Sequence, residues 1–253
     1  MLREILALNV FGFLLVFARV GTALSLMPGI GAAYVTVRIR LLLALAVSFV
    51  LTPLLAPTLP PLPASVPELA LLVLGEMAVG AFLGTLALIV VAALQVAGSV
   101  VALMSSMANA FIQDPIVEQQ SATISGFLTT LGVVLIFVTN LHYLMLDAVV
   151  GSYTLFVPGQ AFAVGDMAEM VARHVADSFA LGLQLAAPLV LTGTTYYLGL
   201  GLLTRLMPQM PVFFVGLPIQ IAIQIAVLML VTSGMMLVFL ERFQQAFAPL
   251  LAP

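Results

Sequence analysis

The chain has 253 residues, of which 63% are hydrophobic and only 7% are charged. A soluble domain of this length carries charge on roughly a quarter of its residues, so the composition excludes a water-soluble globule and predicts an integral membrane-type protein. The net charge is -3 and Lys is absent, which leaves no basic patch for nucleic acid; the absence of Cys excludes disulfides and thiolate chemistry.

Long apolar runs predict an all-α fold built from helical hairpins. A membrane-spanning helix needs about 20 apolar residues, and its backbone groups must be satisfied within the segment. By this rule we expect helices at about 5–27, 39–56, 69–104, 125–157, 178–207 and 212–240. We expect the first helix to be retained rather than cleaved as a signal peptide, because Glu4 offsets Arg3 and no clean small-residue cleavage site follows.

The segments between these runs contain turn-forming residues. Residues 27–40 begin with Met-Pro-Gly and join the first two helices, while residues 52–68 hold six prolines and cannot be helical throughout. Residues 158–177 form the most charged part of the chain and are expected to contain a short amphipathic helix. Residues 207–211 predict a tight break between the last two helices.

A polar stretch at the midpoint, MANAFIQDPIVEQQSATISG (107–126), interrupts the apolar pattern and is too long for a tight turn. Pro115 disfavours helical geometry at Asp114. Irregular backbone at membrane depth is tolerated only where it lines water or is wrapped by protein. Met104 and Met107 flank the stretch with adaptable side chains that can seal an irregular opening. An ordinary exposed loop is the alternative interpretation.

Three charged residues, Arg19, Glu76 and Asp147, lie inside apolar runs. Because a charge at bilayer depth costs at least about 2.5–3.5 kcal/mol, each is expected to face protein or water. One hypothesis is an ion- or solute-coupled transporter, in which Glu76, Asp147 and the 107–126 stretch form a site near the membrane midplane. The alternatives are a buried structural pair, or residues near helix ends that reach the interface.

Small and amide residues predict close helix packing. Gly80 and Gly84 form a small-residue step, and Gly98 continues the same face of the long helix, where small side chains let another helix approach, either within the chain or from another subunit. Gln220 and Gln224 are four residues apart on the last helix, and we expect them to form hydrogen bonds between helices.

The sequence lacks the motifs of common catalytic sites. It contains no GxSxG, Walker A, GxGxxG or HExxH pattern, and a zinc site at its two histidines, His142 and His174, would need distant carboxylates. We therefore expect a protein that is not an enzyme and that uses no cofactor or metal.

Four segments occur in a characteristic order: ARVGTALSLMPGIGAAYVTVRIR (18–40), QDP (113–115), GSYTLFVPG (151–159) and PQMPVFFVGLP (208–218). In this order and spacing, they resemble the FliR/SctT family of export-apparatus subunits from the bacterial flagellum and the related injectisome. The last segment favours the flagellar form. Two positions depart from the family pattern, since Pro211 stands where Asn is usual and Gln220 where a basic residue is frequent.

The resemblance implies a FliP-like first part, residues 1–177, followed by a FliQ-like helical hairpin and tail, residues 178–253. It implies a non-enzymatic subunit of the type III protein export gate. Such a subunit joins FliP and FliQ to form the channel for unfolded flagellar proteins, with FlhB at the cytoplasmic entrance. The expected location is the bacterial inner membrane, within the flagellar basal body.

The resemblance also implies roles for particular residues. The segment that matches 107–126 would project into the channel and plug it at rest. The expected plug residues are Met104, Met107, Phe111, Ile112, Gln113, Asp114, Pro115, Gln119 and Gln120. An entrance loop and partner contacts are expected at Arg205, Pro208, Gln209, Met210, Gln220 and Gln224.

Overall fold

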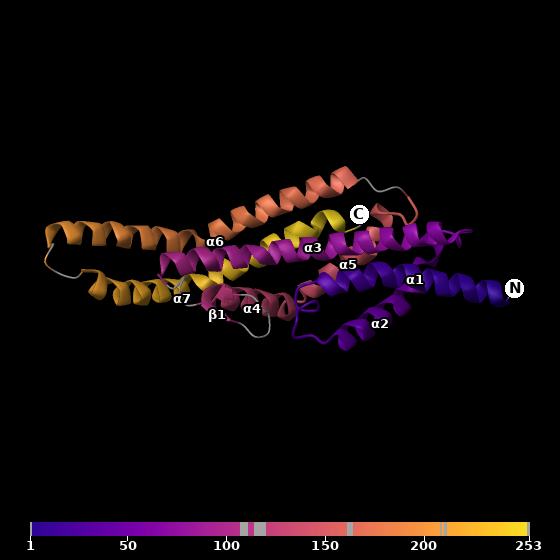
Figure 1. The fold of residues 1–253 in the computed structure, drawn as a ribbon, viewed down its shortest axis with the longest axis horizontal. Helices are drawn as coiled ribbons and strands as arrows, with labels where there is room; N and C mark the ends of the chain where they lie inside the picture. Colours follow the sequence, from indigo (N-terminus) through magenta and orange to yellow (C-terminus); the bar gives the residue numbers. More distant parts are fainter. Residues whose placement is uncertain are drawn as a thin grey trace. The chain divides into compact units, whose positions relative to one another are not determined.

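The computed structural model describes residues 2–106, 111–113, 120–160, 164–207, 209 and 212–251. Helices make up most of this part of the chain (Figure 1). They are α1 (Leu2–Leu26), α2 (Val37–Leu55), α3 (Val66–Met104), α4 (Thr123–Val138), α5 (Leu141–Leu155), α6 (Val164–Leu206) and α7 (Val212–Phe247), with the 3-10 turns η1 (Ala56–Thr58) and η2 (Ala248–Leu250). The two strands β1 (Phe111–Gln113) and β2 (Gln120–Ala122) are short, so the expected all-α class is confirmed.

Within the described residues, four helical segments are long and apolar enough to cross a membrane. They are Val37–Thr58, Val66–Met104, Val164–Leu206 and Gly216–Leu250. The bent pair α4 and α5 provides a further candidate span, and Val10–Leu26 of α1 is a shorter apolar helix. These elements correspond to the six apolar runs of the sequence and confirm the membrane-type helical protein.

The described helices fold into two compact units. Unit 1 contains Met1–Ile89, Ile136–His174 and Gln244–Pro253, and unit 2 contains Val90–Leu135 and Val175–Phe243. The long helices α3, α6 and α7, as well as α4, contribute residues to both units. These units are defined by how compactly the chain folds. The expected division into a FliP-like part, 1–177, and a FliQ-like part, 178–253, is defined by resemblance to other proteins and stays a prediction.

In unit 1, α1 and α2 lie side by side as a hairpin (Figure 1). The turn between them is fixed by Arg40 of α2, whose Nη2 donates hydrogen bonds to the carbonyl oxygens of Ala32 (3.1 Å) and Val35 (3.2 Å). A guanidinium has several donors and can bind two carbonyls at once. Arg40 therefore holds the connection that the Met-Pro-Gly sequence begins.

The helix expected at 125–157 is broken in two, so that expectation was wrong. α4 ends at Val138, α5 begins at Leu141, and the pair is bent by 74°. Asn140 adopts the left-handed conformation, with φ 63° and ψ 15°, which Asn tolerates better than most non-glycine residues. A single left-handed residue ends a helix without lowering the hydropathy of the run, so hydropathy did not reveal it.

The short separate helix expected within 158–177 was also wrong. Residues from Val164 onward belong to α6, which continues without a break to Leu206. The charged residues Asp166, Glu169 and Arg173 are exposed and recur every three or four positions, which places them on one helix face. The charged first part of α6 and the apolar part that follows both fit the helical period. The change in composition between them therefore does not end the helix.

Candidate functional site

The polar stretch at the midpoint follows the end of α3, where side chains of α6 and α7 contact the chain. Met104 is the last residue of α3, and its carbonyl oxygen accepts a hydrogen bond from Gln220 Nε2 of α7 at 2.6 Å. The chain then turns at Ser106, which has φ 58°. The hydroxyl of Ser106 lies 3.0 Å from the hydroxyl of Tyr197 in α6. Side chains from α6 and α7 therefore fix the start of the stretch.

Beyond this start, β1 and β2 form an antiparallel pair. Phe111 is opposite Ala122, Ile112 is opposite Ser121, and Gln113 is opposite Gln120. An antiparallel pair of this kind brings the two ends of the intervening segment together. Residues 111–113 and 120–122 are therefore paired, and these two arms are called the hairpin.

The far arm of the hairpin returns to α3. α4 begins at Thr123, two residues before the start expected for the helix at 125–157, so this end of the polar stretch is helical. The Ser125 hydroxyl donates to the carbonyl oxygen of Gln95 (3.2 Å) and lies 3.1 Å from the Ser99 hydroxyl. A Cβ on Gly98 would lie only 2.3 Å from Ser125 Cα. The start of α4 thus packs directly on α3 because Gly98 has no side chain.

The structure places part of the expected plug. Met104 lies at the end of α3, and the backbones of Phe111, Ile112, Gln113 and Gln120 belong to the paired strands. The remaining plug residues, Met107, Asp114, Pro115 and Gln119, lie outside the described residues. Their plugging role stays a prediction.

The two glutamines of α7 form hydrogen bonds to backbone carbonyl oxygens of α3 and α6. Gln220 and Gln224 are 0% and 2% exposed, and Gln224 Nε2 donates to the carbonyl oxygen of Leu189 in α6 at 3.2 Å. The expected interhelical hydrogen bonds are therefore present within unit 2, and the partner contact expected from these two residues stays a prediction. Of the other entrance-loop residues, Arg205 and Gln209 are exposed, and Pro208 and Met210 lie outside the described residues.

Unit 1 contains a buried ion pair. Arg19 of α1 is 0% exposed and Glu76 of α3 is 2% exposed. Arg19 Nε lies 2.7 Å from Glu76 Oε2, and Nη2 lies 3.0 Å from Oε1. This bidentate arrangement is among the stronger hydrogen-bonding geometries between side chains.

Further contacts from α5 complete the environment of Arg19. Its Nη1 donates to the Ser152 hydroxyl at 3.1 Å, and its Nη2 donates to the carbonyl oxygen of Phe156 at 2.9 Å. The guanidinium carbon lies 3.9 Å from the centre of the Tyr153 ring, within the range of a cation–π contact. The arginine therefore links α1, α3 and the end of α5 through satisfied polar contacts.

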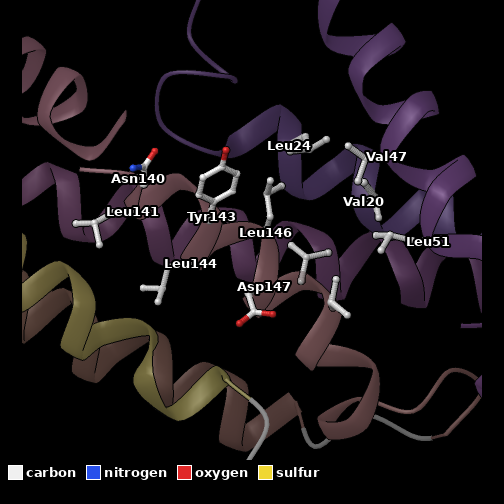
Figure 2. A pocket seen from close by; sticks show the side chains of 12 residues that line it. Val20, Leu24, Val47, Leu51, Asn140, Leu141, Tyr143, Leu144, Leu146 and Asp147 are labelled. Carbon is white, nitrogen blue, oxygen red and sulfur yellow. The ribbon is translucent and has the colours of Figure 1, made fainter. Parts of the chain in front are cut away.

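Asp147 differs from the other two charged residues, because it is exposed on α5, which agrees with a residue that faces protein or water and not with a buried charge. It lines a groove of about 600 Å³, together with residues of α1, α2 and α5. Figure 2 shows Leu24, Val20, Val47 and Leu51 across the groove from the α5 side chains. The expectation treated Asp147 and Glu76 alike, yet only Glu76 has an ionic partner among the described residues.

The remaining small residues allow α1 to pack against α3. A Cβ on Gly80 would lie 2.0 Å from Thr22 Oγ1 and 2.2 Å from the carbonyl oxygen of Arg19. A Cβ on Gly84 would lie 2.6 Å from Leu26 Cβ. Of the two alternatives left open, contact within the chain accounts for these two glycines.

Comparison with known proteins adds to this geometry. The model of the family described as bacterial export proteins, family 1, matches residues 10–246. The flagellar biosynthetic protein FliR of Caulobacter vibrioides is 35% identical over 239 residues, which cover 94% of this chain and 95% of that protein. The chain belongs to the FliR family. FliR proteins of Bacillus subtilis (33% over 176 residues, 68% of each chain) and Aquifex aeolicus (30% over 243 residues, 92% and 90%) are further relatives.

The FliR-family match includes both units and every contact described above. Sequence reasoning missed three residues of the Arg19 site, namely Ser152, Tyr153 and Phe156. They lie in the GSYTLFVPG segment, which signalled the family but no contact. A local pattern could have indicated these residues, because a small hydroxyl residue and aromatic side chains occur where an apolar helix ends. The carbonyl oxygens at a helix end have no partner within the helix and can accept hydrogen bonds from a buried cation.

Proposed function

We propose that this FliR-family chain is a non-enzymatic subunit of the type III protein export gate. In this proposal it forms, with FliP and FliQ, the channel through which unfolded flagellar proteins leave the cell. Family membership makes it a component of the flagellar export apparatus, and such a component works in a complex with other export proteins. Its long apolar helices indicate membrane association.

The finer assignments belong to the same proposal. Residues 1–177 are the FliP-like part, and residues 178–253 are the FliQ-like hairpin and tail. FlhB contacts the cytoplasmic entrance, where the break between α6 and α7 presents the exposed side chains of Arg205 and Gln209. The complex lies in the inner membrane, within the flagellar basal body.

The observation that carries the proposal is the hairpin between α3 and α4. A channel plug must be firmly attached at its base, yet yield when a chain passes. The base is attached through Gln220 to Met104 and through Ser125 to Gln95. Between these attachments stands a two-stranded pair of three residues on each side. An isolated two-stranded hairpin is marginally stable in water, so a passing chain can displace it without unfolding the helices.

The ion- or solute-coupled transporter has less support. Both carboxylate oxygens of Glu76 are bonded to Arg19, and Glu76 is 2% exposed. A coupling site needs a carboxylate that can exchange its ion with water. The closed pair instead has the features of a structural contact.

The plug assignment can be tested by deletion. In the complex co-expressed with FliP and FliQ, deletion of residues 109–120 is expected to preserve assembly and to make the membrane leak ions, because only the part beyond the helix attachments is removed. Complex yield by size-exclusion chromatography and ion conductance in a planar bilayer measure the two effects. A Gly/Ser linker of the same length serves as the control for chain strain and is expected to leak as well. An intact complex with unchanged conductance would remove the plug assignment.

The attachment of the hairpin gives a second test. Gln220→Leu removes the donor to the part-buried Met104 carbonyl, and the loss of a typical hydrogen bond costs about 0.5–1.5 kcal/mol. We expect the variant complex to assemble and to leak more than the wild type, though less than the deletion. Gln184→Leu is the matched control, since Gln184 is an exposed residue of α6 in the same unit. Equal conductance of the two variants would contradict the proposed role of this hydrogen bond.

A further inference from the structure

One face of α6 contacts α7 and the end of α3 within unit 2 (Figure 1). Leu189, Gly193 and Tyr197 lie on this face, because they are four residues apart along the helix. The carbonyl oxygen of Leu189 accepts a hydrogen bond from Gln224 Nε2 at 3.2 Å. The hydroxyl of Tyr197 lies 3.0 Å from the hydroxyl of Ser106. Gly193 is buried and lies between these two contacts along the helix.

Met104, the last residue of α3, lies directly against Gly193. A Cβ at position 193 would lie 3.2 Å from Met104 Cβ, 3.4 Å from Met104 Sδ and 2.9 Å from Gln224 Nε2. Carbon atoms in favourable contact are about 3.5–4.0 Å apart, so any other residue at this position would press on Met104. The absence of a side chain at position 193 therefore lets the end of α3 approach the backbone of α6.

The hydrogen bonds of the two glutamines do not replace this contact. Gln220 Nε2 donates to the Met104 carbonyl oxygen, which holds the backbone but not the side chain. The Oε1 atoms of Gln220 and Gln224 are buried and have no hydrogen-bond partner among the described residues. A buried acceptor without a partner lowers stability, so stability alone does not account for these glutamines. Their Nε2 groups fix the end of α3 relative to α6 and α7.

We propose that Gly193 is a positioning residue of the closed gate. It admits the Met104 side chain and the amide of Gln224 to the backbone of α6. It thereby sets the position of the end of α3, from which the chain continues through Ser106 toward the hairpin. Because Gly193 is buried, it acts through Met104 and not on the exported chain. This inference rests on the proposed function, since it requires the hairpin to act as a plug.

Enlarging residue 193 in the complex co-expressed with FliP and FliQ tests the proposal. Gly193→Val is expected to raise the ion conductance without export substrate about tenfold, which corresponds to about 1.4 kcal/mol. Gly193→Ala is expected to give a smaller increase, because one methyl group displaces Met104 less than three carbons do. Conductance is measured in a planar bilayer on complexes purified by size-exclusion chromatography, so that only assembled complexes contribute. A Gly193→Ala complex with wild-type conductance would overturn the inference, including the case in which Gly193→Val does not assemble.

A glycine with open space on the same helix is the matched control. A Cβ on Gly199 of α6 would have no atom within 4 Å. Gly199→Ala and Gly199→Val are therefore expected to keep the conductance within about twofold of the wild type. Equal conductance of the Val variants at positions 193 and 199 would contradict the proposed role of Gly193.

A second control separates positioning from a general loss of packing. A Cβ on Gly182 would lie 2.8 Å from the carbonyl oxygen of Ala93 and 2.8 Å from Val96 Cβ, both in α3. This contact lies about three turns of α6 before Gly193. Gly182→Ala is expected to lower the thermal unfolding temperature without raising the conductance of the complexes that assemble. If Gly182→Ala and Gly193→Ala raised the conductance equally, looser packing of α6 on α3 would explain the leak and the inference would be wrong.

The two hypotheses fail differently. If deletion of residues 109–120 leaves the conductance unchanged, the plug assignment of the proposed function is wrong. If the deletion raises the conductance and the variants at position 193 conduct like those at position 199, the inference about Gly193 alone is wrong.

Discussion

Replacing Glu76 with Gln is expected to prevent accumulation of the folded chain. The substitution leaves the guanidinium of Arg19 with 0% exposure and without its counterion. Removing one partner of a buried ion pair costs about 3–5 kcal/mol, a large part of the total of about 5–15 kcal/mol that stabilises a typical protein. The measurements are the yield of detergent-solubilised protein and its thermal unfolding temperature.

A second ion pair in the same chain is the matched control. Arg173 Nη2 lies 2.5 Å from Glu169 Oε1 on α6, but the two side chains are 75% and 62% exposed. An exposed pair four residues apart contributes only about 0.3–0.5 kcal/mol. Glu169→Gln is therefore expected to keep the wild-type yield and unfolding temperature. If both Glu→Gln variants behaved alike, burial would not determine the importance of the Arg19 pair.

Replacing both members of the buried pair separates structure from function. The double variant Arg19→Met and Glu76→Met is expected to recover much of the yield, because apolar residues of similar volume often replace a buried pair at little cost. Recovery is expected to be incomplete, since the Phe156 carbonyl loses its donor. A recovered complex that no longer exports protein would give the pair a role beyond folding and would revive the transporter hypothesis.

The sequence predicted the helices well because apolar length and proline positions act locally. The six apolar runs correspond to helical elements, and the proline-rich segment 52–68 separates α2 from α3. The cost of a buried charge also predicted that Arg19 and Glu76 need partners. The pairing itself joins residues 57 positions apart, so no local pattern could identify it.

The failures of sequence reasoning have a common physical cause. Asp147 and Glu76 occur in similar apolar runs, but one faces a groove and the other faces Arg19. Which face of a helix is covered depends on tertiary packing. The bend at Asn140 was also missed, because one left-handed residue redirects the chain while the neighbouring residues keep their preference for helix.

The hairpin illustrates how these local and tertiary effects combine in the proposed gate. The polar composition of 107–126 predicted non-helical backbone, and the structure adds attachments from three helices at its two ends. Tyr197 and Gln220 hold the first arm, and α3 accepts the second through Ser125. Rigid attachment together with weak pairing between the arms is a combination that composition alone does not specify.

Gly80→Ala is expected to destabilise the chain strongly, although Ala is the better helix former. The new Cβ would lie 2.0 Å from Thr22 Oγ1 and 2.2 Å from the backbone carbonyl oxygen of Arg19. A side chain could rotate away, but the carbonyl cannot, so α1 must move away from α3. Overpacking of this kind costs about 1–3 kcal/mol or more, and the movement also disturbs the ion pair of Arg19 with Glu76. Thermal unfolding in detergent and the yield of the complex measure the loss.

A glycine with open space gives the opposite expectation. Gly234 lies in α7, and an added Cβ there would have no atom within 4 Å. Gly234→Ala is therefore expected to raise the unfolding temperature, because Ala is favoured over Gly inside a helix by about 0.8–1.0 kcal/mol. Opposite signs for the two Gly→Ala substitutions would show that close approach of α1, rather than helix propensity, requires Gly80. A stabilising Gly80→Ala would instead mean that α1 and α3 do not pack at this distance.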